Sequence, residues 1–181
     1  MATLVVCTGN ICRSPMAAAL LGERLRGVPE LVPVESAGLL AEGFAADKSA
    51  CQAMAGLGHD ITTHASRRLT AEAVAAAELV VGMERLHVRE AVVMAPEAFP
   101  RCFTLRELVR RGRAVGPRRP DQPVRHWLAQ LAEGRTHADL LGESAIDDID
   151  DPMGMPASVF RSLAAELDEL TAAFAALVAG G

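Results

Sequence analysis

The sequence predicts an α/β protein, a three-layer sandwich in which a four-stranded parallel sheet is flanked by helices. Short apolar segments alternate along the chain with longer segments of helical periodicity, which is the pattern of consecutive strand–helix–strand units. The first of the short segments, Thr3–Val6, is apolar and β-branched, as a parallel strand buried on both faces is. Because parallel strands are joined by crossovers, helices are expected on both faces of the sheet.

The individual elements are predicted from the same patterns. Strands are predicted at Thr3–Val6, Val32–Ser36, Glu78–Met83 and Cys102–Leu105. Helices are predicted at about 15–26, 49–57, 70–77, 85–93 and 158–178. Pro15 suits a first helical turn, Gly58 stops the second helix and Pro96 comes after the fourth. We expect these elements to form one domain over residues 1–181.

The segment of about residues 106–145 departs from this alternation. Between Arg106 and Arg125 the chain carries seven arginines, interrupted by glycines and prolines. This composition favours an inserted basic surface segment, a loop or a short helix, with Trp127 anchoring the residues after it. Such a segment could dock an acidic partner, although a solvated surface is the simpler expectation.

Composition excludes several classes of function. No apolar run is long enough for a membrane span and no secretory signal precedes the first strand, so a cytoplasmic location is expected. The net charge of −5 gives no general attraction to nucleic acid. The four cysteines are too scattered for a disulfide framework or a metal site, so neither a metal nor a cofactor is predicted.

The most informative motif is the loop Cys7–Ser14, which reads Cys-Thr-Gly-Asn-Ile-Cys-Arg-Ser. It lies between the first expected strand and the first expected helix, where backbone N–H groups and the helix dipole create an anion site. The predicted substrate-binding residues are those of the loop after its first cysteine: Thr8, Gly9, Asn10, Ile11, Cys12, Arg13 and Ser14.

Three side chains of this loop indicate chemistry on phosphate. The environment should favour the thiolate of Cys7, which would be positioned to attack phosphorus. Arg13 supplies a planar fork that can hold two oxygens of a transferring phosphoryl group. Ser14 lies where its hydroxyl could donate to the Cys7 sulfur. We therefore expect Cys7 and Arg13 to be catalytic.

A second chemical signal is the acidic run Asp147–Asp151, with Pro152 directly after it. Clustered carboxylates favour one another's protonated form, as a general acid requires. Pro152 disfavours helix at Asp151 and can hold that carboxylate outward. For Asp147 and Asp148 the favoured interpretation is a solvated acidic loop or a cation site.

The segment Val6–Pro15 resembles the N-terminal signature of the low-molecular-weight protein tyrosine phosphatase family. Weaker matches occur in the family's order, namely Ser36-Ala37-Gly38, His64-x-x-Arg67-x-Leu69 and Asp151-Pro152. The resemblance implies a flavodoxin-like phosphatase I fold and hydrolysis of phosphotyrosine or aryl phosphate monoesters through a phosphocysteine. It also implies a phosphotyrosine protein as substrate and a cognate tyrosine kinase as partner.

The resemblance further implies roles for single residues. Asp151 would protonate the leaving group and then deprotonate the attacking water. Asn10, Ser14, Ser36 and His64 would form a hydrogen-bond network that supports the loop. The remaining histidines, His87 among them, are expected to be structural or on the surface. The position of Cys12, five residues after Cys7 in the same loop, independently predicts that its thiol traps oxidised Cys7 as a disulfide, with simple packing beneath the loop as the alternative.

The expected substrate cleft is poor in aromatic residues. The chain has no tyrosine, Met153 comes after the Asp-Pro pair, and Phe44 is the expected aromatic wall. Related arginine phosphatases resemble this loop but carry Thr at the position of Ile11, so Ile11 favours an aryl phosphate.

Three other functions stay open at this level. An arsenate reductase that uses a small thiol would need only this loop, whereas Cys51 and Cys102 lack the spacing of a thioredoxin-coupled enzyme. A protein arginine phosphatase is disfavoured by Ile11. A non-enzymatic phosphate-binding module would be expected to lose Cys7, Arg13 or the Asp-Pro acid, and all are present.

Overall fold

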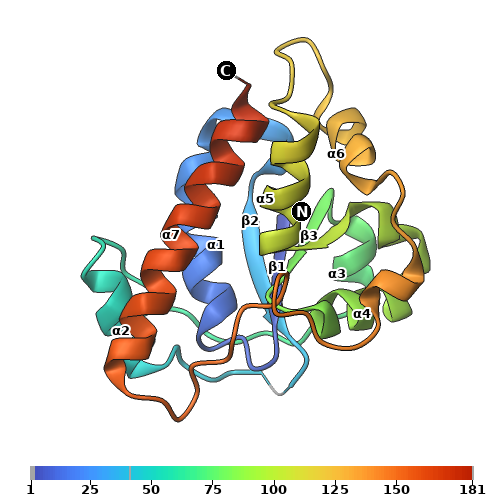
Figure 1. Cartoon of the computed structure of the whole chain (residues 1–181). Coiled ribbons are helices and arrows are strands. Elements are labelled where there is room, and N and C mark those ends of the chain that lie inside the picture. Colours follow the sequence, from blue (N-terminus) through green and yellow to red (C-terminus); the bar gives the residue numbers. More distant parts are fainter. Residues whose placement is uncertain (1–2, 41, 181) are drawn as a thin grey trace.

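The computed structural model describes residues 3–40 and 42–180, and its centre is a parallel sheet (Figure 1). The strands are β1 (Thr3–Cys7), β2 (Val34–Gly38), β3 (Leu79–Gly82) and β4 (Cys102–Thr104). They pair in the order β2-β1-β3-β4, and every pairing is parallel. The predicted four-stranded sheet is therefore confirmed.

The helices connect these strands and continue the chain after the last one. They are α1 (Arg13–Arg24), α2 (Lys48–Ala55), α3 (Ala71–Ala76), α4 (Arg85–Met94), α5 (Leu105–Val115), α6 (Val124–Ala132) and α7 (Ala157–Ala179). Short 3₁₀ helices lie at Leu25–Gly27, Pro29–Leu31, Pro96–Arg101 and His137–Leu140.

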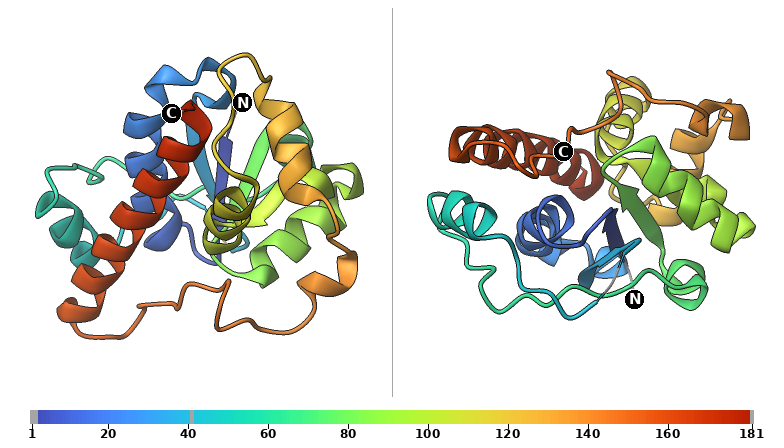
Figure 2. Two further views of the ribbon diagram at one scale, coloured as in Figure 1. Left: turned by 45° about the horizontal axis from the view of Figure 1, so that its top comes forward. Right: turned by 90° about the horizontal axis from the view of Figure 1, so that it is seen from below.

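Two apolar cores lie on opposite faces of the sheet, as a three-layer sandwich requires. Val5 and Val81 pack beneath α1, α5 and α7, whereas Leu4, Val6 and Val80 pack against α3 and α4. Figure 2 shows the two helix layers on either side of the strands. Alternate residues of each strand point to opposite faces, so a strand buried on both sides must be apolar throughout.

Of the two forms expected for the basic segment, a loop or a short helix, its first part has the helix, α5 (Leu105–Val115). Leu108 and Val109 are buried, and a Cβ at Gly112 would lie 3.0 Å from the Leu177 side chain of α7. The arginines occupy the opposite side of this helix, which gives it a strongly amphipathic pattern. That the segment is an insertion stays a prediction.

The first helix begins two residues earlier than expected, at Arg13 rather than Pro15. Arg13 and Ser14 therefore belong to the first turn of α1, and both are buried at the carboxyl end of β1. In parallel sheets this is the edge at which ligands bind. In the part of the chain that the structure describes, no helix is long and apolar enough to cross a membrane.

Candidate active site

The loop between β1 and α1 surrounds the sulfur of Cys7. Cys7 is the last residue of β1 and is almost fully buried. Its Sγ accepts a hydrogen bond from the Asn10 amide at 3.2 Å and lies 2.9 Å from Ser14 Oγ. Because Ser14 is in the first turn of α1, the sulfur lies at the positive end of that helix. These are the groups that stabilise a thiolate or a bound oxyanion.

Asn10 holds the loop in its shape. Its φ of 52° is in the left-handed region, which asparagine tolerates better than most residues. Its buried side-chain amide donates to Ser14 Oγ at 2.9 Å and to Ser36 Oγ at 2.8 Å. The backbone carbonyl oxygen of Asn10 accepts a hydrogen bond from His64 Nε2 at 2.7 Å. The structure thus brings together the four residues for which the resemblance implied a supporting network.

Gly38 lets the end of β2 approach the loop closely. A Cβ at this position would lie 2.8 Å from the Asn10 nitrogen and 2.9 Å from the Thr8 carbonyl oxygen. That same oxygen accepts a hydrogen bond from the Leu39 amide at 2.8 Å. Any side chain at residue 38 would therefore push the loop away from β2.

Arg13 is buried beside the loop, with 1% of its surface exposed. Its Nη1 donates to the Ile149 carbonyl at 2.9 Å and forms an ion pair with Glu84. Its Nη2 donates to Asp151 Oδ2 at 2.6 Å. Glu84 and Ile149 therefore fix one side of the guanidinium, while the other side holds the carboxylate of Asp151.

Glu84 and His87 belong to this site although no motif in the sequence indicated them. Glu84 precedes α4, and its backbone N–H donates to His87 Nδ1 at 3.0 Å. His87 Nε2 lies 3.0 Å from Thr8 Oγ1. Burial, and secondarily the charge of Arg13, lower the pKa of His87 to about 3, so the imidazole is neutral near pH 7. The structural role expected for this histidine includes a direct contact with the phosphate loop.

The acidic run divides into two parts with different surroundings. Asp151 reaches Arg13, and its other oxygen accepts from the Met153 amide at 3.1 Å. The solvated loop expected at Asp147 and Asp148 is wrong. Asp147 is buried in ion pairs with Arg85 and Arg110 at 3.1 and 3.0 Å, and Asp148 Oδ1 accepts from the Arg85 amide at 2.7 Å. The Asp147 carboxylate thus links α4 to α5, whereas the Asp148 carboxylate binds the backbone at the start of α4.

Cys12 is buried beneath the mouth of the site. Its Sγ lies 3.2 Å from Met153 Sδ. Burial, with added repulsion from Asp47, Cys7 and Asp151, raises the pKa of this thiol to about 12, so it is neutral near pH 7. Among the described residues, all four cysteines are free thiols. The redox role of Cys12 stays a prediction.

A pocket of about 180 Å³ opens above the loop. Ile11, Leu40 and Met153 form its apolar walls, and Cys7 and Asp151 also line it. Phe44, the expected aromatic wall, is not among the lining residues and is largely exposed. The walls that the structure describes are therefore aliphatic and sulfur-containing.

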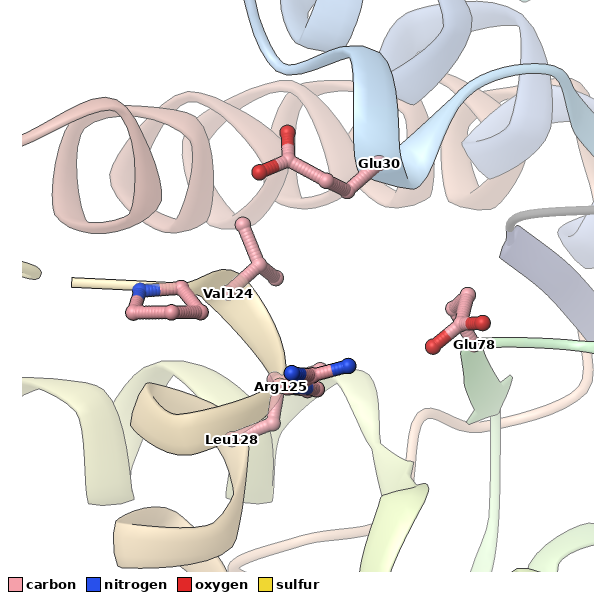
Figure 3. Close-up of a pocket in the computed structure, with 6 residues that line it drawn as sticks. Glu30, Glu78, Val124, Arg125 and Leu128 are labelled. Atoms are coloured by element: carbon pink, nitrogen blue, oxygen red, sulfur yellow. The ribbon is translucent and has the colours of Figure 1, made fainter.

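A second hollow, of about 280 Å³, lies at the opposite, amino end of the strands (Figure 3). The side chains of Glu30, Glu78 and Arg125 face it above an apolar floor that includes Leu128. Its described lining residues carry neither a thiol nor a buried charge, so the catalytic chemistry is not located there. Within the described ranges, no group of three or more His, Cys, Asp or Glu side chains is arranged to hold a metal ion.

On an α/β sandwich, a buried thiol at the floor of a phosphate-sized loop, flanked by an arginine and a carboxylate, defines a cysteine-dependent phosphatase. The comparison with known families agrees. The model of the low molecular weight phosphotyrosine protein phosphatases matches residues 2–117, and the chain belongs to this family.

Three relatives indicate the range within that family. A probable low molecular weight protein-tyrosine-phosphatase, EpsP of Ralstonia nicotianae, is 43% identical over 106 residues, which cover 58% of this chain and 70% of that protein. The crystal structure of a low molecular weight protein tyrosine phosphatase from T. tengcongensis is 30% identical, with a TM-score of 0.69 and 96% of each chain covered. The YwlE arginine phosphatase from Geobacillus stearothermophilus is 32% identical, with a TM-score of 0.69 and coverage of 96% of this chain and 90% of that one.

Proposed function

We propose that this protein hydrolyses phosphotyrosine or related aryl phosphate monoesters through a phosphocysteine at Cys7. The observation that carries the proposal is the convergence of Cys7, Arg13 and Asp151 on one pocket at the carboxyl end of β1, with the hydroxyl of Ser14 against the Cys7 sulfur. Asp151 is far from the other three in sequence, and each of the four groups has a separate task in phosphoryl transfer.

In the first step, the thiolate of Cys7 attacks phosphorus and the bond from phosphorus to the leaving oxygen breaks. Asp151, in its protonated form, gives its proton to that oxygen, because a phenolate or alkoxide is a poor leaving group without one. Arg13 Nη2 and the loop N–H groups hold the phosphoryl oxygens as charge shifts toward them.

In the second step, water attacks the phosphocysteine while Asp151 takes one of its protons. The S–P bond breaks and inorganic phosphate leaves, which returns Cys7 to its thiolate and Asp151 to its protonated form. Ser14 Oγ, 2.9 Å from the sulfur, stabilises the departing thiolate. The reaction needs neither a metal ion nor a cofactor.

Arg13 Nη2 binds either Asp151 or the phosphoryl group. In the free protein, Asp151 Oδ2 occupies it at 2.6 Å. A dianionic phosphate carries more charge and more acceptor oxygens than a carboxylate, so it displaces Asp151 toward the leaving group. This exchange places the acid where the first step requires it.

Ile11 supports an aryl phosphate over a phosphoarginine. It forms part of the apolar wall and offers no hydrogen-bonding group to a guanidino nitrogen. An aromatic ring can lie between Ile11, Leu40 and Met153 and gain apolar burial. A phosphotyrosine-bearing protein is the proposed substrate and a cognate tyrosine kinase the proposed partner. The proposed location is the cytoplasm, whose reducing conditions would keep Cys7 from being oxidised.

The relatives include both tyrosine and arginine phosphatases, so the test must compare the two substrates. The experiment measures kcat/KM for a phosphotyrosine peptide and a matched phosphoarginine peptide in EDTA, with Cys7→Ala as the control. We expect hydrolysis of the phosphotyrosine peptide that Cys7→Ala abolishes, with phosphoarginine at least roughly tenfold slower. Faster turnover of phosphoarginine would overturn the substrate assignment.

A parallel assay addresses arsenate. Reduction of arsenate with glutathione, together with negligible phosphatase turnover, would contradict the proposed function and favour the redox alternative.

A further inference from the structure

The contact between α4 and the phosphate loop fixes the direction of one hydroxyl group. His87 is fully buried in the first turn of α4, and its Nε2 lies 3.0 Å from Thr8 Oγ1. The two residues are 79 positions apart, so only the fold brings them together.

The hydrogen bonds determine which ring nitrogen carries the proton. The Glu84 backbone N–H can only donate, and it donates to His87 Nδ1 at 3.0 Å. Nδ1 is therefore an acceptor without a proton. Because a histidine in this buried place is neutral near pH 7, its single proton is on Nε2. The ring consequently donates to Thr8 Oγ1.

Thr8 Oγ1 receives a second donor from the other side. Arg13 Nη2 lies 3.4 Å from it, and a guanidinium has no acceptor. A hydroxyl oxygen has two lone pairs and one proton. With both neighbours donating, the proton of Thr8 has to point away from His87 and Arg13. Thr8 lines the same pocket as Cys7 and Asp151, so this proton is available there.

We propose that His87 is a positioning residue that orients the Thr8 hydroxyl, and that Thr8 donates a hydrogen bond to the phosphoryl oxygen held by Arg13 Nη2. This inference rests on the proposed function, because it adds a donor to that same site. Glu84 serves the arrangement twice, since its carboxylate pairs with Arg13 and its backbone N–H sets the tautomer of His87. One residue before α4 thereby fixes two donors to the phosphate.

The first experiment removes the hydroxyl without changing the shape of the side chain. Thr8→Val should lower kcat/KM for p-nitrophenyl phosphate by roughly tenfold to a hundredfold, since a hydrogen bond to a charged group is lost. Thr8→Ser keeps the hydroxyl and should stay within about threefold of the wild type. The same variants are titrated calorimetrically with inorganic phosphate, where Thr8→Val should bind more weakly.

The second experiment asks whether His87 acts through Thr8. His87→Phe should lower kcat/KM about threefold to tenfold, and His87→Gln, whose amide can still donate to Thr8, should recover most of that loss. In the Thr8→Val background, His87→Phe should cost nothing further. His126→Phe, on an exposed position of α6, is the matched control, and thermal unfolding shows that each variant is folded.

The outcomes separate this inference from the proposed function. Suppose that the wild type shows no Cys7-dependent turnover, while Thr8→Val still weakens the binding of phosphate. This result would overturn the proposed phosphatase activity and support the hydrogen bond from Thr8 to phosphate. If the wild type turns over and Thr8→Val equals it in both kcat/KM and phosphate binding, Thr8 does not donate to the phosphate. Additive losses for Thr8→Val and His87→Phe would overturn the positioning role and leave His87 as a packing residue.

Discussion

At the residue scale, Asp151 and the substrate phosphate share one guanidinium nitrogen. Asp151 Oδ2 accepts from Arg13 Nη2 at 2.6 Å, although about 40% of the Asp151 side chain is exposed. An ion pair with one exposed partner contributes little to stability. The ion pair between Asp151 and Arg13 therefore matters because Asp151 competes with the phosphate for Arg13, and it adds little to the stability of the fold.

Replacing this carboxylate separates its two effects. Asp151→Asn should slow hydrolysis of phosphotyrosine by roughly two to four orders of magnitude, with a smaller effect on substrates that have good leaving groups. Inorganic phosphate should inhibit the variant about threefold to tenfold more strongly, because a competing negative charge at Arg13 is gone. Steady-state kinetics with phosphate as inhibitor measure both. Weaker inhibition would contradict the competition, and a more damaging Asp150→Ala would show that the acid is assigned wrongly.

Gly38 provides a second test of the loop. Gly38→Ala places a Cβ 2.8 Å from the Asn10 nitrogen and 2.9 Å from the Thr8 carbonyl oxygen, and these backbone atoms of the loop leave it no space. We expect a loss of about 1–3 kcal/mol in the free energy of unfolding and at least a roughly tenfold loss of kcat/KM. Gly27→Ala is the control, since nothing lies within 4 Å of a Cβ there. Equal behaviour of the two variants would show that the loop does not depend on this close approach.

At the element scale, α4 and α5 are joined through a buried carboxylate. Asp147 pairs with Arg85 at the start of α4 and with Arg110 in α5. Arg106, also in α5, donates to Glu166 of α7 at 2.6 Å. The basic face of α5 thus contacts neighbouring elements, and its charge is largely compensated inside the molecule.

Removing Asp147 should destabilise the protein. Asp147→Ala leaves two partly exposed arginines without a partner, and we expect a loss of about 1–3 kcal/mol in chemical denaturation. Asp121→Ala, whose carboxylate is exposed and 3.7 Å from Arg119, is the control and should leave stability essentially unchanged. If both changes have the same effect, the acidic run is solvated after all.

The sequence predicted those elements and contacts that depend on local pattern. The alternation of short strand-like segments with helical ones predicted all four strands. The motif positions of Asn10, Ser36 and His64 anticipated their contacts. At α5 the composition left a loop and a short helix both open, and the structure has a helix with apolar residues buried on one side. The roles of Glu84, His87 and Asp147 depend on partners in other elements, which no local pattern encodes.

At the scale of the whole molecule, folding keeps His87 neutral. Burial lowers the pKa of His87 from 6.5 to about 3, so below pH 6.5 the unfolded chain binds a proton that the folded protein does not. Stability is therefore full above pH 6.5 and falls as the pH decreases toward 3. This single group should cost about 2 kcal/mol of unfolding free energy between pH 7 and pH 5.

Urea denaturation of the wild type and His87→Phe at both pH values measures this contribution. We expect the variant to lose less stability on acidification, by about that amount. An identical pH dependence in the two proteins would mean that His87 has the same pKa in the folded and the unfolded protein, and that burial does not keep it neutral at pH 5.

The central claim is that phosphate passes through the sulfur of Cys7. The most direct measurement mixes the protein with a phosphotyrosine peptide in EDTA, quenches within milliseconds and maps the phosphorylated residue by mass spectrometry. We predict a phosphoryl group on Cys7 in the wild type during turnover, and no such group in Cys7→Ala. Turnover of the peptide without any adduct on Cys7, or turnover that survives Cys7→Ala, would contradict the mechanism.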